Sequence, residues 1–185
     1  MKHCTLMPSP LGDILLRAED DALTGLFFVG QKYFPTQEVV GASVASLPVL
    51  HEARDQLGEY FAGERRTFTV RVRPAGTAFQ RSVWDELMKI PYGHVESYGG
   101  LAQRLGLAAG SARAVGAANG RNPVSIILPC HRVISGAGDL TGYAGGLARK
   151  EALLALERPA SAGPRQLELL DAADSARTAT RQEAR

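Results

Sequence analysis

The sequence predicts an α+β protein with a small N-terminal domain of strands and a helix, followed by a mainly helical C-terminal domain that contains a helix-turn-helix. Strand-like apolar runs concentrate in the first third of the 185 residues, helical apolar spacing dominates after residue 78, and 74-PAGT breaks both patterns. We therefore expect domains at residues 1–75 and 76–158, followed by a tail at 159–185.

The N-terminal domain is predicted to contain a hairpin, a helix and a further strand. The runs 13-DILLRAE and 23-LTGLFFVG flank the turn Asp20-Asp21, which is the pattern of a hairpin. In 49-VLHEARDQLGEYF, apolar side chains recur at helical spacing. In 67-TFTVRVRP, apolar and polar residues alternate, as in a strand with one polar face.

Helices are predicted in the C-terminal domain at residues 79–90, 100–105, 111–119 and 147–157. Thr77 precedes the first helix and is suited to cap it, and Ser97 starts the second. A glycine turn at Gly106 separates the second helix from the third, which is helix-turn-helix spacing. Packed helix pairs without a DNA partner share this spacing, so both interpretations remain open.

Positive charge concentrates in the middle of the chain. Residues 1–63 contain four Lys or Arg and eight Asp or Glu, whereas residues 64–132 contain ten and four. No acidic residue occurs between Ser97 and Asp139. The arginines of that stretch are Arg104, Arg113, Arg121 and Arg132. This distribution predicts a surface that faces a polyanion, with scattered solvated arginines as the alternative.

The second helix of the pair is rich in small residues, and Arg113 is its only long side chain. The small residues are Ala112, Ala114, Gly116, Ala117 and Ala118. A helix that reads bases in the major groove would present several Arg, Asn or Gln side chains. Small side chains instead suit close approach to a minor groove or to another helix, and in the first case Arg113 would enter the base stack.

One of the two cysteines lies beside a histidine at the end of an apolar run, in 125-SIILPCHRV. We expect this run to be a buried strand that ends near Pro129, so that the chain turns Cys130 and His131 toward a common cleft. There His131, directly or through a water, would take the thiol proton, and Glu157 would orient the imidazole. An inert buried cysteine is the competing interpretation.

Composition excludes several classes of protein. Two cysteines without a CxxC pair, no secretory pattern and no apolar run of about 20 residues predict a cytoplasmic protein without disulfides or membrane spans. No second cysteine or histidine stands at ligand spacing near Cys130, so we expect no metal there. His3, Cys4 and His51 would form a metal site only if the fold assembled them.

A glycine-rich segment, 142-GYAGG, follows the cysteine. Its backbone can approach a flat ligand closely, with Tyr143 as a wall and Tyr98 as a hydroxyl donor. A thiol nucleophile beside such a slot and a DNA-facing helix pair predicts attack on a modified base turned out of the duplex. The alternatives are a DNA-binding sensor with an inert Cys130 and a cysteine hydrolase that uses Cys130 and His131.

Between Ser9 and Glu157 the chain resembles the O6-alkylguanine-DNA alkyltransferases (methylated-DNA–protein-cysteine methyltransferases) of the stand-alone bacterial type. The motifs that carry the resemblance are 59-EYFAGERRTF, 76-GTAFQRSVWDELMKIPYG, 97-SYGGLA, 112-ARAVGAANGRNP, 126-IILPCHRVI and 141-TGYAGGLARKEALL. The resemblance implies a ribonuclease-H-like N-terminal domain and a winged-helix-like C-terminal domain. The tail lies beyond it, and the Ala, Arg and Asp content of the tail predicts a mobile segment or a loose helix.

The resemblance also implies a DNA-repair reaction and the residues that perform it. Cys130 corresponds to the acceptor that takes a methyl or larger alkyl group from O6 of guanine, or less well from O4 of thymine, in one irreversible turnover without a cofactor. His131 corresponds to the water-mediated base and Glu157 to the carboxylate that orients it. Asn122 corresponds to a brace of the active-site turn, and Tyr98 to the residue that rotates the nucleotide and protonates the departing base.

Two further sets of residues are implied to contact DNA and the extruded base. The DNA-binding candidates are Ser97, Tyr98, Ala112, Arg113, Ala114, Gly116, Asn119 and Arg121. The base-pocket candidates are Val133, Tyr143, Ala144 and Gly145. Ala144 replaces a serine of some relatives, which leaves a backbone contact there, and Asn119 replaces a methionine that packs on the base. The implied partner is double-stranded DNA carrying O6-alkylguanine, bound by a monomer that holds no metal.

Overall fold

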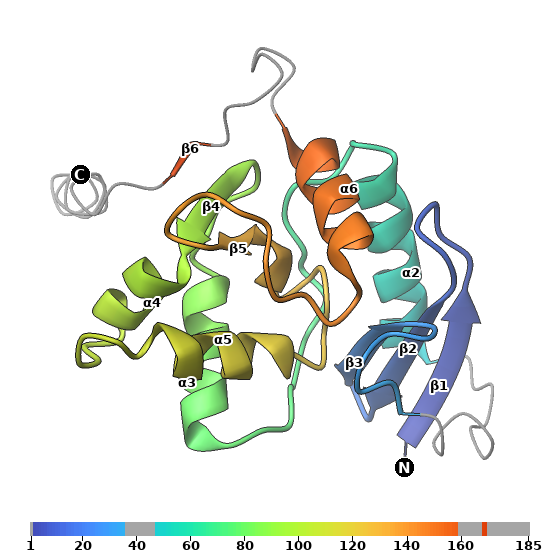
Figure 1. The fold of residues 1–185 in the computed structure, drawn as a ribbon. Helices are drawn as coiled ribbons and strands as arrows, with labels where there is room; N and C mark the ends of the chain where they lie inside the picture. Colours follow the sequence, from blue (N-terminus) through green and yellow to red (C-terminus); the bar gives the residue numbers. More distant parts are fainter. Residues whose placement is uncertain (1, 36–46, 159–167, 170–185) are drawn as a thin grey trace, which may run out of the picture.

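The computed structural model describes residues 2–35, 47–158 and 168–169. A three-stranded antiparallel sheet packed against one helix forms the N-terminal part, and short helices dominate the C-terminal part (Figure 1). This arrangement confirms the predicted α+β class with a small sheet domain and a helical domain. The predicted tail at 159–185 lies outside the described residues, except for the short strand β6 (Glu168–Leu169).

The N-terminal sheet has the order β1-β2-β3. Its strands are β1 (Lys2–Met7), β2 (Ile14–Glu19) and β3 (Ala22–Phe28). The predicted hairpin is β2–β3, and every residue of β3 is buried. The sequence analysis missed β1, because this edge strand is short and buries only Cys4 and Met7, so it leaves little apolar pattern to read.

Helix α2 (Pro48–Phe61) packs on β2 and β3 through a face that includes Leu50, Leu57 and Tyr60. The strand predicted at 67–73 is wrong. That segment makes one isolated parallel bridge, Leu23 to Val72, with backbone hydrogen bonds on either side of it. Pro74 follows at once, and because proline has no N–H to donate, the pairing cannot propagate into a ladder.

The C-terminal helices are α3 (Ala78–Leu87), α4 (Tyr98–Arg104), α5 (Ala112–Gly120) and α6 (Leu147–Glu157). Both predicted caps are confirmed: Thr77 forms a capping box with Gln80, and the Ser97 hydroxyl accepts a hydrogen bond from the N–H of Gly100. Helix α3 ends at Leu87, three residues before the predicted end. None of the helices in the described part of the chain is long and apolar enough to cross a membrane.

A second, parallel sheet of order β5-β4-β6 lies beside these helices. Strand β4 (His94–Ser97) runs directly into α4, and β5 (Val133–Ile134) follows the turn that carries Cys130. Gly106, at φ +66°, ends α4 and starts the turn to α5. The β4–β5 pairing therefore joins the helix-turn-helix to the cysteine segment.

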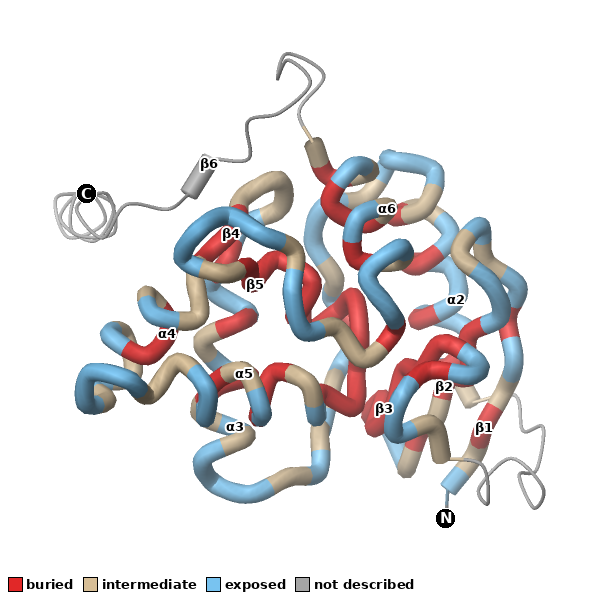
Figure 2. Tube along the Cα trace, viewed as in Figure 1, coloured by how far each residue is buried: buried red, intermediate tan, exposed pale blue. Residues whose placement is uncertain are grey.

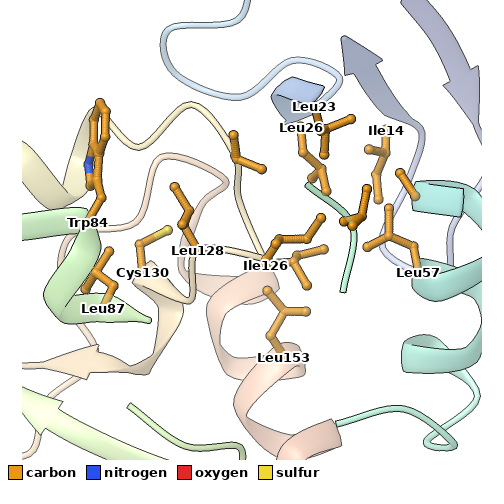
Figure 3. Packing of buried hydrophobic residues seen from close by; sticks show 14 of the residues in the cluster. Ile14, Leu23, Leu26, Leu57, Trp84, Leu87, Ile126, Leu128, Cys130 and Leu153 are labelled. Atoms are coloured by element: carbon orange, nitrogen blue, oxygen red, sulfur yellow. The ribbon is translucent and has the colours of Figure 1, made fainter. Parts of the chain in front are cut away.

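One continuous apolar core joins the two parts of the chain. Figure 3 shows Leu26 and Leu57 of the N-terminal part on the same side of the cluster as Ile126 and Leu153. Cys130 and Leu128 lie farther along it, toward Leu87 and Trp84. In Figure 2 the buried segments meet between the sheet and the helices. Each large apolar side chain buried there contributes about 1.5–3 kcal/mol of transfer free energy, so the core holds the two parts together.

Candidate active site

The residues before Cys130 form a compact turn where the sequence analysis expected a buried strand. Val124 makes an isolated bridge to Leu26 of β3, and the N–H of Ser125 donates to the carbonyl of Leu26 at 3.1 Å. Ile126 then adopts a positive φ of 70°, which reverses the chain. The run is fully buried, as predicted, but its backbone bonds go to β3, to Asn122 and to other residues of the turn itself, and no ladder forms.

Asn122 holds this turn closed. Its side-chain N–H donates to the carbonyl of Leu128 at 2.8 Å, and its side-chain oxygen accepts from the N–H of Val124 at 2.9 Å. A β-branched residue at positive φ costs about 1–3 kcal/mol and persists only when its surroundings impose it. Asn122 supplies that constraint around Ile126 through its two hydrogen bonds.

Cys130 and His131 lie in one short 3₁₀ turn, η1 (Cys130–Arg132), and both are buried. Burial raises the pKa of the Cys130 thiol to about 11, although Asn122 and Lys150 oppose the shift. At pH 7 only about one thiol in 10⁴ is then ionised. The resting site therefore holds a thiol, and a nucleophilic thiolate requires a base that removes the proton as the reaction proceeds.

His131 is held in a single tautomer by Glu157. Burial lowers the pKa of His131 although the neighbouring carboxylate opposes the shift, so the imidazole is neutral near pH 7. Its Nε2 lies 2.7 Å from Oε1 of Glu157. Because a carboxylate accepts, Nε2 carries the proton and Nδ1 carries a lone pair. Nδ1 is buried and has no hydrogen-bond partner among the described residues.

Glu157 remains ionised although it is buried. Burial by itself would raise the pKa of Glu157, but the donors and positive charge around it, from His131 and Arg132, lower the pKa well below its ordinary value. Arg132 reaches both carboxylate oxygens, at 2.7 and 3.0 Å, and also donates to the carbonyl of Ile90. Tyr60 donates to Oε1 at 2.7 Å, and the N–H of Gly93 is 3.4 Å from Oε2. The carboxylate is thus held by donors from three segments of the chain.

The predicted polyanion-facing surface has to be corrected at two arginines. Arg132 is buried against Glu157. Arg104 pairs with Glu86 and Glu96 and is three-quarters buried. The acid-free stretch of sequence concealed these pairings because the acidic partners lie outside it. Among the four arginines of that stretch, Arg113 and Arg121 are the exposed ones.

Tyr98 and Lys150 organise the glycine-rich segment. The Tyr98 hydroxyl donates to the carbonyls of Thr141 and Gly142, at 3.1 and 3.2 Å. The buried ammonium of Lys150 donates to the carbonyls of Val133 and Thr141. Burial lowers the pKa of Lys150 to about 8. Gly142 has a φ of +57°, and a Cβ there would lie 3.0 Å from the Tyr98 hydroxyl, so the position needs glycine.

The N-terminal domain supports the same segment from the other side. The N–H of Lys32 donates to the carbonyl of Ala144 at 3.0 Å. Arg149, on α6, donates to the carbonyl of Leu11 at 2.9 Å. A Cβ on Gly145 would press on Phe28 and Tyr143. Ala144 and Gly145 therefore contact the N-terminal domain, whereas Val133 lies in β5. Val133 and Gly145 are buried, and Tyr143 and Ala144 are partly buried.

The DNA-binding candidates fall into two groups. Arg113 and Ala114 are exposed on α5, and Ala112 and Gly116 are partly exposed on the same helix. Arg121 is exposed just beyond α5, where its guanidinium stacks over the ring of Tyr33 at 4.0 Å. Ser97, Tyr98 and Asn119 instead have internal roles: Ser97 caps α4, Tyr98 bonds the glycine-rich segment, and Asn119 is buried with its N–H on the carbonyl of Cys130 at 3.3 Å.

The described residues contain no group of three or more His, Cys, Asp or Glu side chains able to hold a metal ion. The described side chains of the site supply a thiol, a neutral imidazole with an unpartnered lone pair, an ionised carboxylate and buried hydroxyls. The sequence analysis did not assign Tyr60, Arg132 or Lys150 to the active site. Each acts through a partner far along the chain, so no local pattern marks it.

Known protein families match both parts of the chain. Residues 2–74 match the ribonuclease-like domain, and residues 78–159 the DNA binding domain, of the 6-O-methylguanine DNA methyltransferases. The Methylated-DNA--protein-cysteine methyltransferase of Mycobacterium leprae is 48% identical over 161 residues, which cover 85% of this chain and 93% of that protein.

Solved structures show the same likeness. The O6-methylguanine methyltransferase of Mycobacterium tuberculosis superposes with a TM-score of 0.78 at 44% identity, covering 89% of this chain and 97% of that one. A structure of the M. tuberculosis protein in complex with DNA superposes with a TM-score of 0.74 at 45% identity, covering 85% and 96%. The chain described here belongs to the 6-O-methylguanine DNA methyltransferase family.

Proposed function

We propose that the protein repairs DNA by moving the alkyl group of O6-alkylguanine onto Cys130, with His131 as the base. One observation carries the assignment of roles: His131 adjoins Cys130 in a single turn, donates from Nε2 to Glu157 and keeps a buried, unpartnered lone pair on Nδ1. That arrangement supports proton transfer from a thiol whose pKa is about 11.

The proposed step balances without a cofactor. His131 takes the thiol proton at Nδ1, directly or through a water, and Glu157 stabilises the resulting imidazolium. The sulfur attacks the alkyl carbon, so a C–S bond forms as the bond from that carbon to O6 breaks. Tyr98 donates its proton to the departing guanine and regains the proton that His131 took from Cys130, directly or through a water, which leaves His131 and Tyr98 as they began. The products are guanine and an alkylated Cys130, and because a thioether is stable the protein acts once.

DNA is proposed to bind across α5. Small side chains on its exposed face allow the helix backbone to approach a minor groove, and Arg113 is long enough to fill the gap left by an extruded base. Phosphates would supply affinity that falls with salt, and the pocket at Val133, Tyr143, Ala144 and Gly145 would select the damaged base. We further propose that the protein acts as a monomer in the cytoplasm, with O4-alkylthymine as a poorer substrate.

Intact-protein mass spectrometry tests the proposal. After incubation with a duplex that contains O6-methylguanine, the protein should gain one CH₂ unit, and peptide mapping should place it on Cys130. Cys130→Ser should bind the duplex and gain nothing. Label on another residue would overturn the assignment, and so would repeated turnover on an ester or amide, which would indicate a hydrolase.

A further inference from the structure

Several buried polar atoms around Cys130 lack a hydrogen-bond partner among the described residues. They are Asn119 Oδ1, His131 Nδ1 and the Tyr143 hydroxyl. Buried polar atoms are nearly always paired, so each exception needs an explanation. The proposed proton transfer gives His131 Nδ1 a role. The Tyr143 hydroxyl can act as a donor or as an acceptor, so it does not require one particular kind of partner. Asn119 Oδ1 can only accept, and the proposed reaction gives it no role.

The orientation of the Asn119 amide follows from its neighbour. The amide nitrogen lies 3.3 Å from the carbonyl oxygen of Cys130. Because a carbonyl only accepts, the NH₂ group must face it, and Oδ1 must point the other way. Asn119 is 1% exposed, and the indole N–H of Trp84 donates to the carbonyl of Ala118 at 3.0 Å, so this end of α5 is held in place.

The amide also lies beside Tyr98. Burial and Cys130 raise the pKa of Tyr98, and Thr141 and Asn119 oppose that shift. The Tyr98 proton is directed to the carbonyls of Thr141 and Gly142, so it does not serve Asn119. Asn119 therefore lies between Cys130, which would accept the alkyl group, and Tyr98, which would protonate the departing base. Its Oδ1 is a buried acceptor to which no described residue donates.

The chemistry of the substrate identifies that donor. Alkylation of O6 removes the hydrogen from N1 of guanine, so the exocyclic 2-amino group is the donor left on the base edge that carries O6. O4-alkylthymine has lost the hydrogen on N3 and offers no N–H donor. The 2-amino group and O6 flank N1 on the same edge of the base. A base whose O6 faces the Cys130 sulfur would therefore bring its amine toward the surroundings of Cys130, where Asn119 contacts the Cys130 carbonyl.

We infer that Asn119 Oδ1 accepts a hydrogen bond from the 2-amino group of the alkylated guanine and makes Asn119 a specificity-determining residue. This inference rests on the proposed function. A site with a buried acceptor rejects an analogue that lacks the matching donor, because the acceptor is then buried without a partner. The wild-type protein should therefore transfer methyl from O6-methylguanine about tenfold or more faster than from O6-methylhypoxanthine, which lacks the amine.

The test is a comparison of single-turnover rates on two duplexes, one with O6-methylguanine and one with O6-methylhypoxanthine. Asn119→Leu keeps the side-chain shape and removes the acceptor. It should slow transfer from the guanine duplex about tenfold, affect the hypoxanthine duplex far less, and so bring the two rates close together. Gln56→Leu is the control, since it removes a buried amide of the N-terminal domain, and it should leave the ratio of the two rates unchanged.

Other outcomes separate this inference from the proposed function. Equal slowing of both duplexes by Asn119→Leu would overturn the inference and leave Asn119 as a brace of Cys130. Equal rates on both duplexes in the wild-type protein would overturn it without any variant. If Asn119→Leu does not fold, Asn119→Ala is expected to give the same loss of discrimination. Failure of the wild-type protein to gain a methyl group on Cys130 would contradict the proposed function itself.

Discussion

The hydroxyl of Tyr60 donates to Oε1 of Glu157 across 2.7 Å, although the two residues are 97 positions apart. Tyr60 belongs to α2 of the N-terminal domain, and Glu157 is the last residue of α6. Burial and the adjacent carboxylate raise the pKa of Tyr60 far above its usual value, so the phenol stays protonated and remains a donor. The same oxygen accepts from His131, so the N-terminal domain contacts the proposed catalytic machinery directly.

Tyr60→Phe should therefore slow alkyl transfer several-fold and lower the free energy of unfolding by about 1–3 kcal/mol, because a buried carboxylate loses a donor while the ring packing is kept. Urea unfolding and single-turnover transfer measure the two effects. Tyr92→Phe is the control: its ring lies against Tyr60 but its hydroxyl donates to the carbonyl of Leu156. Equal slowing by both variants would show that Tyr60 has only a structural role.

Stability should fall as the pH drops below about 6.5. The folded protein keeps His131 neutral and Glu157 ionised, so both pKa values are lower than in the unfolded chain. The unfolded chain therefore binds more protons, first at His131 near pH 6.5 and then at Glu157 near about 4.3. Urea midpoints should change little between pH 7.5 and about 6.5 and should decrease from there to pH 4.5. In His131→Gln the decrease should begin about one pH unit lower, and an unchanged onset would contradict a buried neutral histidine.

Asn122→Ala should leave the N–H of Val124 buried without a partner and the carbonyl of Leu128 with only the N–H of Cys130, at a cost of about 1–3 kcal/mol. Because the turn at Ile126 then relaxes, transfer per folded molecule should also slow by about tenfold or more. Gln56→Ala is a matched control: Gln56 braces the irregular stretch at Thr69 with its own amide, far from the thiol. Gln56→Ala should lower stability without slowing alkyl transfer. A comparable loss of transfer in both variants would refute a specific role for Asn122.

Gly116→Ala should raise the stability of the protein and at the same time weaken its binding to DNA. Alanine in a helix is favoured over glycine by about 0.5–1 kcal/mol, and a Cβ at residue 116 would meet the Tyr98 ring at an ordinary 3.7 Å, so the melting temperature should rise. The same methyl group should weaken duplex binding several-fold if α5 approaches DNA closely. Gly58→Ala, on the exposed face of α2, should stabilise equally without affecting DNA. Unchanged duplex affinity in Gly116→Ala would argue against this face as the DNA surface.

Much of the secondary structure could be predicted because it depends on near neighbours. Thr77 caps α3 through Gln80, and Ser97 caps α4 through Gly100, so residue types within one turn decide these helix starts. The wrong predictions of secondary structure occur where contacts between distant segments determine the backbone conformation. Residues 67–73 alternate like a strand but meet β3 at one bridge, and residues 126–128 are apolar like a strand but are bent around Asn122.

The sequence by itself determined that a thiol and an imidazole are adjacent, that a carboxylate ends the last predicted helix, and that a helix pair precedes them. Only the tertiary structure decided that Glu157 stays ionised between Arg132 and Tyr60, that the Cys130 thiol stays protonated, and that Asn119 keeps an unpaired oxygen beside it. The reason is physical: periodicity and capping act within about four residues, whereas burial and ion pairing depend on which distant segments share one core.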